Sequence, residues 1–150
     1  MYRSNALTNI FYTIINKKDY VNALNQLRNI QVYGTTMTSY RKIHSLITDV
    51  VDKVLSFEQA GQGSSITNEK VSMIVSELVK ISLLVMYQKR RNLINPIIAD
   101  GLHNILNNIT STLQNYLKSG DLRYIELAKK QVDALKIIID GILAFHYKNK

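Results

Sequence analysis

The scarcity of helix-breaking residues is the feature that most constrains the fold of this chain. Its 150 residues include one proline, Pro96, and six glycines. A β fold needs many turns, which draw on proline and glycine, so this composition favours long helices. Apolar residues make up 46% of the sequence, which is enough to bury a core and argues against disorder. We therefore expect one all-α domain covering residues 1–150.

The spacing of apolar residues divides the chain into five or six helices. Apolar side chains recur at i, i+3, i+4 and i+7, the period of a helix with one buried face. The predicted helical segments are 5–30 (with a break near 16–19), 38–60, 67–91, 96–117 and 121–147. A stretch rich in glycine and serine predicts a flexible loop near residues 61–66. The predicted architecture is a single compact bundle of five to six helices.

Capping residues mark where these helices begin. The predicted N-caps are Asp19, Thr38 or Ser39, Thr67 or Asn68, and Asp121. Pro96 suits the first turn of its helix, where the missing N–H is not needed. The apolar run at 81–87 is too short to span a bilayer, which takes about 20 residues, so it predicts a helix turn buried on most sides.

Net charge and cysteine content limit the partners and the compartment. The formal charge is +8, from 19 basic and 11 acidic residues, which favours an anionic partner such as nucleic acid over an inert basic surface. The absence of cysteine excludes disulfides and thiolate metal sites, and is compatible with a reducing cytosol. Residues 1–5 carry one cation and no long apolar region follows, so we expect no signal peptide and a cytoplasmic protein.

The sequence offers no group of residues typical of an active site. The three histidines, His44, His103 and His146, are far apart in the chain, and we expect His146 to be packed and hydrogen-bonded rather than a general base. Asp100 and His103 share a helical face, but two ligands do not make a metal site, and a solvated pair is expected. The spacings of a phosphate-binding loop and of a serine nucleophile turn are also absent. We expect a non-enzyme, with no catalytic residue, metal or cofactor.

Cations gather at the ends of two predicted helices. Arg41 and Lys42 lie near the start of the segment at 38–60, where positive charge opposes the helix dipole and therefore suggests a role beyond stability. Tyr87 lies between cations on one side of the next segment, a layout suited to backbone contact combined with base stacking. Phosphate contacts of this kind provide affinity without reading sequence. The candidate nucleic-acid-binding residues are Arg41, Lys42, Lys80, Lys89, Arg90 and Arg91.

Three short motifs carry a resemblance to a known family. Residues 35–43 read TTMTSYRKI, residues 87–91 read YQKRR, and residues 140–146 read DGILAFH. In their order, and in the size of the chain, they resemble the small all-helical subunit of the type III (Csm-type) CRISPR effector complex. The motifs span residues 35 to 146, so the resemblance covers most of the chain.

The resemblance implies a structural role without catalysis. Copies of such a subunit stack into a short filament along the guide RNA and its target, in contact with the other CRISPR effector subunits, and hold the duplex by its backbone. Arg41, Lys42, Arg90 and Arg91 would make the main contacts, with Lys80 and Lys89 second. The alternative is a helical protein-interaction or viral structural scaffold without nucleic-acid function. A membrane-surface protein would need a basic amphipathic helix with an aromatic-rich apolar face, and residues 5–30 contain too many asparagines for that.

Overall fold

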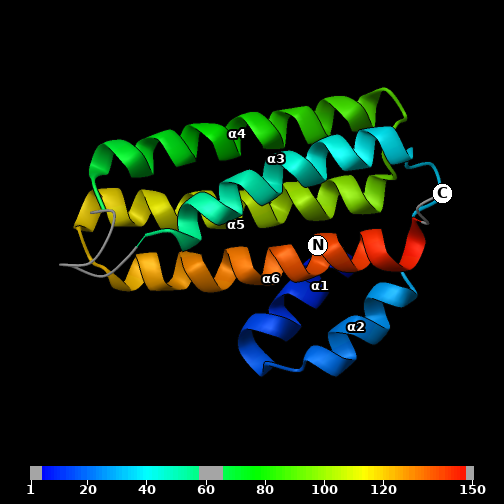
Figure 1. Cartoon of the computed structure of the whole chain (residues 1–150), viewed down its shortest axis with the longest axis horizontal. Coiled ribbons are helices and arrows are strands. Elements are labelled where there is room, and N and C mark those ends of the chain that lie inside the picture. Colours follow the sequence, from blue (N-terminus) through cyan, green and yellow to red (C-terminus); the bar gives the residue numbers. More distant parts are fainter. Residues whose placement is uncertain (1–4, 58–65, 148–150) are drawn as a thin grey trace.

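The structure, a computed structural model, describes residues 5–57 and 66–147. These residues form helices and no strand, which confirms the all-α bundle (Figure 1). The elements in chain order are α1 (Ala6–Tyr12), the π-helical turn η1 (Thr13–Lys17), α2 (Tyr20–Arg28), α3 (Met37–Leu55), α4 (Asn68–Arg90), α5 (Pro96–Ser119) and α6 (Arg123–His146). The flexible loop expected near 61–66 falls almost wholly outside the described residues. That loop and the assignment of residues 1–150 to one domain stay predictions.

The four long helices make an antiparallel bundle, and the N-terminal helices cover one side of it. Helix α3 packs against α4 and α6, and α5 packs against the same two helices. In the described part of the chain α4 and α6 do not touch, so they lie on opposite corners of the bundle. Helices α1 and α2 pack on α5 and α6, beneath the bundle in Figure 1. The outer sides of α4 and α6 therefore face away from each other.

Most of the predicted helix boundaries are confirmed by the contacts at the helix ends. The side chains of Asp19 and Thr67 accept hydrogen bonds from backbone N–H groups in the first turns of α2 and α4. Pro96 occupies the first turn of α5, and Gly120 ends that helix with a left-handed φ of 69°. Asp121 accepts from the N–H of Arg123 at 2.9 Å, although Leu122 is the residue that immediately precedes α6. The break in the segment at 5–30 is also confirmed, and it centres on η1 and the left-handed Lys18.

Two boundaries differ from the prediction. Helix α3 is capped by Thr36 instead of Thr38 or Ser39, and it ends at Leu55 instead of continuing toward residue 60. Helix α2 ends at Arg28, two residues before the predicted end of that segment at residue 30. Because α3 begins at Met37, Arg41 and Lys42 lie in its second turn, where the helix dipole opposes positive charge less than in the first turn.

Helix α4 is more exposed than its composition predicts. The run at 81–87 was expected to be buried on most sides, but Leu83 is 65% exposed and Tyr87 57% exposed. Met73 and Val79 lie on the same outer side and are exposed as well. By length and composition α4 is apolar enough to cross a membrane, and 39% of its most apolar window is buried inside the bundle. We refer to the side of α4 that carries Met73, Val79, Leu83 and Tyr87 as the outer face of α4.

Candidate nucleic-acid interface

The two motifs that lie furthest apart in the sequence meet in the structure. The hydroxyl of Tyr40, near the start of α3, donates a hydrogen bond to the carbonyl of Ile139 in α6. The ring of Tyr147 stacks on the ring of Tyr40, with 5.2 Å between the centroids. Tyr40 is almost fully buried between α3 and α6. Tyr40 and the two residues that flank 140–146, Ile139 and Tyr147, therefore form one packed unit.

A small charged network holds the same two helices together. Nε2 of His44 lies 2.7 Å from Oδ1 of Asp140. Nζ of Lys136 donates to the same oxygen at 2.8 Å and lies 3.3 Å from the hydroxyl of Thr48. Asp140, the acidic residue of the third motif, thus connects α3 with α6 and has its charge balanced by a lysine. No feature of the sequence linked His44 to Asp140, because they are 96 residues apart.

The turn between α4 and α5 is tied to this unit by backbone and threonine contacts. The N–H of Thr36 donates to the carbonyl of Leu93 at 3.0 Å, and the N–H of Asn95 donates to the hydroxyl of Thr35 at 2.8 Å. The hydroxyl of Tyr147 donates to the carbonyl of Thr35 at 3.0 Å. The start of α3, the end of α4, the start of α5 and the end of α6 consequently share one end of the bundle, at the right of Figure 1. We call it the basic end because of the cations described next.

The antiparallel packing of α3 and α4 brings their cations to the basic end. Nζ of Lys53 on α3 lies 2.8 Å from Oε1 of Glu77 on α4, which sets the register of the pair. Eleven residues from this ion pair toward the basic end, α3 carries Lys42 and α4 carries Gln88. Since helices rise about 1.5 Å per residue, Arg41 and Lys42 lie level with the last turn of α4. They therefore share the basic end with Arg90 and Arg91.

The six candidate cations differ in their surroundings. Arg41 is exposed, and Lys42 and Arg90 are exposed without an ion pair to any residue in 5–57 or 66–147. The guanidinium of Arg91 lies 5.6 Å from the centroid of the Tyr87 ring, a cation–π contact. Lys89 is committed to an ion pair, since its Nζ lies 2.8 Å from Oδ1 of Asp100.

Lys80 is separated from the other five cations. It lies seven residues before Tyr87, which corresponds to about 10 Å along α4. Its side chain lines a groove of about 320 Å³ between α3 and α4, together with Asp49 and Glu77. Two carboxylates beside Lys80 make this position less favourable for phosphate than the basic end.

One further cation at the basic end was missed by the sequence analysis. Arg28 ends α2, and its guanidinium lies 4.8 Å from the centroid of the Phe145 ring in α6. His146 accompanies it, because its Nε2 lies 2.8 Å from the carbonyl oxygen of Leu27. This contact confirms the expectation of a packed, hydrogen-bonded histidine. No sequence signal would have placed Arg28 here, since its position depends on how α2 docks on α6.

The remaining polar residues considered for catalysis or metal binding have structural partners. Asp100 pairs with Lys89, and Nδ1 of His103 lies within hydrogen-bond distance of the hydroxyl of Ser82, so each residue has a partner on α4, while the side chain of Asp100 stays 45% exposed. Asp49 pairs with Lys53 at 3.3 Å, as ordinary surface charge. Within the described ranges no three His, Asp or Glu side chains are close enough together to hold a metal ion.

Burial raises the pKa of two tyrosines at the basic end, Tyr40 and Tyr147. It raises the pKa of Tyr40, and the neighbouring Tyr147 and Asp140 raise it further. Burial also raises the pKa of Tyr147, against the opposing effect of the side chain of Thr35. Both phenols are neutral near pH 7, and the two carboxylates at this end of the bundle, Asp100 and Asp140, are each paired with a lysine. The unbalanced charge of this surface is positive.

Comparison with protein families, with curated proteins and with solved structures finds no match to this chain.

Proposed function

We propose that this protein is a non-catalytic small subunit of a type III CRISPR ribonucleoprotein effector complex, which binds the backbone of the guide RNA and its target. The observation that carries the proposal is the basic end itself. Residues 35–43, 87–91 and 140–146, which resemble the family at three separate places in the sequence, lie at the same end of the bundle. Shared geometry of this kind is expected if the three motifs serve one surface.

The chemistry of the basic end suits RNA held by its backbone. Arg41, Lys42, Arg90 and Arg91 present positive charge from two adjacent helices, and Lys89 is a weaker candidate because Asp100 already neutralises it. The wide minor groove of A-form RNA exposes phosphates and hydroxyls, so recognition through shape and charge is the usual mode. Tyr87, exposed and backed by Arg91, adds a surface on which an unpaired base can stack.

Stacking of several copies is part of this proposal, as is contact with the other effector subunits. The outer face of α4 presents Met73, Val79 and Leu83 to solvent, an apolar surface of the kind that marks protein contacts. Because α4 and α6 lie at opposite corners of the bundle, a contact that joins α4 of one copy to the α6 side of the next would build a filament. We place the protein in the cytoplasm, without catalytic residues or a cofactor.

The same apolar face supports a second candidate function. A helical protein-interaction or viral structural scaffold would use the outer face of α4 and would have no need for the basic end. The two functions differ in what the cations do, so a charge substitution separates them.

The test is RNA binding by the purified full-length chain, measured by fluorescence anisotropy against a guide–target RNA duplex over a range of salt concentrations. The variant replaces Arg41, Lys42, Arg90 and Arg91 by alanine. A matched control variant replaces Lys118, Arg123, Lys129 and Lys130 by alanine. It removes the same amount of positive charge from the opposite end of the bundle. Each phosphate contact contributes about 0.7 to 0.9 to the slope of log K against log salt, so we expect the first variant to lose a slope of about three.

The control variant should keep most of that slope, because only non-specific attraction changes. Equal binding by the wild type and both variants would overturn the proposal and favour the scaffold. An equal loss in both variants would also contradict it, because it would mean that net charge alone, and not the basic end, provides the affinity.

A further inference from the structure

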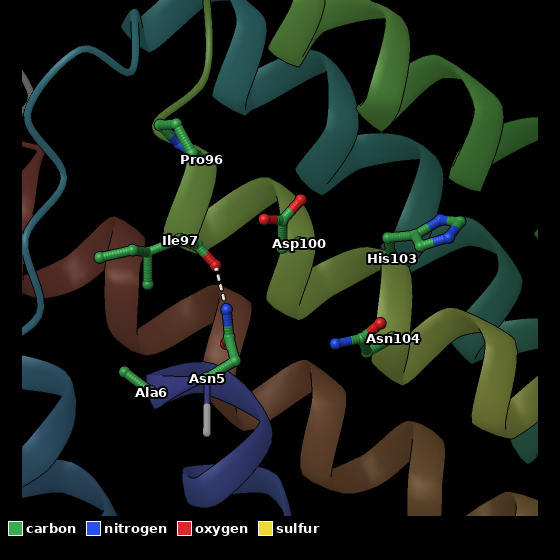
Figure 2. A pocket seen from close by; sticks show the side chains of 7 residues that line it. All are labelled: Asn5, Ala6, Pro96, Ile97, Asp100, His103 and Asn104. Carbon is green, nitrogen blue, oxygen red and sulfur yellow. Dashed lines mark hydrogen bonds between the residues drawn. The ribbon is translucent and has the colours of Figure 1, made fainter. Parts of the chain in front are cut away.

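We propose that a hollow beside the basic end binds a purine base, and adenine in preference to guanine. The hollow has a volume of about 650 Å³ and lies between the start of α1 and the first turns of α5 (Figure 2). Asn5 and Ala6 line it from α1, and Pro96, Ile97, Asp100 and Asn104 line it from α5. This size is in the range of pockets that hold a nucleoside.

The walls of the hollow are held in place by hydrogen bonds. Nδ2 of Asn5 donates to the carbonyl of Ile97 at 2.9 Å, and Oδ1 of Asn5 accepts from the N–H groups of Leu7 and Thr8. His103 has both ring nitrogens engaged, one by Ser82 and the other by Asn107 at 3.1 Å. These side chains are committed to the protein, so they shape the hollow and leave its recognition to other groups.

Two polar groups remain able to recognise a ligand. The amide of Asn104 makes no hydrogen bond with any residue in the described ranges, and Figure 2 shows it pointing toward Asn5 across the hollow. Asp100 uses Oδ1 for Lys89, and no described contact engages its Oδ2. The hollow therefore offers an amide, with one donor end and one acceptor end, and a carboxylate oxygen beside it.

The charges around the hollow favour a neutral ligand. A phosphate placed here would meet the carboxylate of Asp100, and a cation would meet the ammonium of Lys89. Ala6, Pro96 and Ile97 add apolar surface, and Ile97 is 44% exposed. A neutral ring with a polar edge and an apolar face satisfies all of these conditions, and a nucleobase is such a ring.

The free groups distinguish between the purines. Adenine presents an amine donor beside a ring-nitrogen acceptor, which an asparagine amide matches with two hydrogen bonds. Asp100 provides a second acceptor for the amine. Guanine presents two acceptors on the equivalent edge, which suit arginine or lysine, and here the lysine is already paired with Asp100.

The first experiment is a titration of the ¹⁵N-labelled full chain with adenosine and, separately, with guanosine, followed by amide chemical shifts. We expect adenosine to shift residues of α1 and the first turns of α5, and guanosine to shift them less. Asn104→Leu removes the amide, and Asn115→Leu is its control at an exposed position of the same helix. Ala6→Trp fills the hollow, and Ala144→Trp is its control at an exposed position of α6.

Loss of one neutral hydrogen bond weakens binding by about fivefold, so Asn104→Leu should lower adenosine affinity by at least about that factor. Ala6→Trp should abolish the shifts, and both controls should bind as the wild type does. The proposal is overturned by an absence of shifts around the hollow, or by equal effects of Asn104→Leu and Asn115→Leu.

A second experiment separates this inference from the proposed function. The inference rests on the proposed function only in taking RNA as the molecule that carries the adenine. RNA carrying unpaired adenines is compared with the same RNA in which those positions are abasic, using the wild type and Asn104→Leu. Tighter binding of the adenine-containing RNA by the wild type alone supports the hollow as a base site within the RNA interface. Adenosine binding without RNA binding upholds the hollow and contradicts the proposed function, whereas RNA binding without any effect of adenines upholds the function and contradicts the hollow.

Discussion

At the scale of single residues, Tyr40 shows how one side chain can join distant parts of the chain. Its ring is buried between α3 and α6, its hydroxyl reaches the carbonyl of Ile139, and its face stacks on Tyr147. In the sequence, Tyr40 belongs to residues 35–43, the first of the three motifs that carry the family resemblance. The sequence did not predict this contact, because the period of a helix says nothing about which residue of a distant helix lies opposite.

The buried phenol of Tyr40 predicts a loss of stability at alkaline pH. The pKa of Tyr40 is higher in the folded chain than in the unfolded chain, where it is about 10. Its contribution is therefore fully present below pH 10 and is lost as the pH rises further, by about 1.4 kcal/mol per pH unit. Tyr40→Phe should be about 1 kcal/mol less stable than the wild type at pH 8, because it lacks the hydrogen bond, and the difference should shrink above pH 10.

Urea unfolding at pH 8 to 11 measures both quantities. Tyr33→Phe is the control, since Tyr33 is 87% exposed and should follow the wild type at every pH. A constant difference between wild type and Tyr40→Phe across this range would contradict the burial of the phenol.

At the scale of elements, the helix starts that the sequence predicted correctly are those set by local chemistry. Asp19, Thr67 and Pro96 act through contacts within their own first turns. The start of α3 was missed because several threonines and a serine in 35–39 are equally good caps by local criteria. Long-range hydrogen bonds from the N–H of Thr36 to the carbonyl of Leu93, and from the N–H of Asn95 to the hydroxyl of Thr35, accompany the choice of Thr36.

Two glycines inside helices lie against residues from the N-terminal part of the chain. A Cβ at Gly101 would lie 2.6 Å from Cβ of Leu7 and 2.5 Å from Oδ1 of Asn5, so this glycine allows α1 to pack closely on α5. A Cβ at Gly141 would lie 2.7 Å from Cδ1 of Leu27, which is the flexible end of a side chain and can move. The two positions should therefore differ in their response to alanine.

We expect Gly101→Ala to lower the free energy of unfolding by about 1–2 kcal/mol, because overpacking exceeds the gain of about 1 kcal/mol in helix propensity. Gly141→Ala should change it by less than about 1 kcal/mol, since the side chain of Leu27 can adjust. Urea denaturation of both variants, with Ser111→Ala as a control at an exposed position of α5, gives the comparison. Equal losses at the two glycines would contradict this difference between the two packing sites.

At the scale of the whole molecule, the bundle could be predicted from the sequence, but the surfaces proposed to bind RNA and other copies could not. Apolar periodicity predicted the long helices, and the 82% helix among the described residues confirms the all-α bundle. The gathering of cations at the basic end depends on helix order, length and register, which only the folded chain reveals. The exposure of Leu83 was also missed. Helix α4 carries apolar residues on two sides, and the sequence does not show that only one of these sides packs on the bundle.

The outer face of α4 predicts self-association of the proposed small subunit. Leu83 is 65% exposed near the middle of this face, so Leu83→Glu should weaken contact between copies through burial of an unpaired charge. Sedimentation velocity over a range of concentrations should show a shift toward monomer, with helix content unchanged. Leu122→Glu is the control, because Leu122 is 50% exposed just before α6. A wild type that remains monomeric at every concentration would contradict the prediction.

The contact between Thr35 and Tyr147 also bears on the order in which the chain folds. These residues are 112 positions apart, so closing the loop between them costs more chain entropy than the local turns within each helix. During synthesis Arg41 and Lys42 leave the ribosome long before Tyr147. The cations of the basic end therefore exist early in the life of each molecule, and the surface that arranges them forms only after residue 147 has been made.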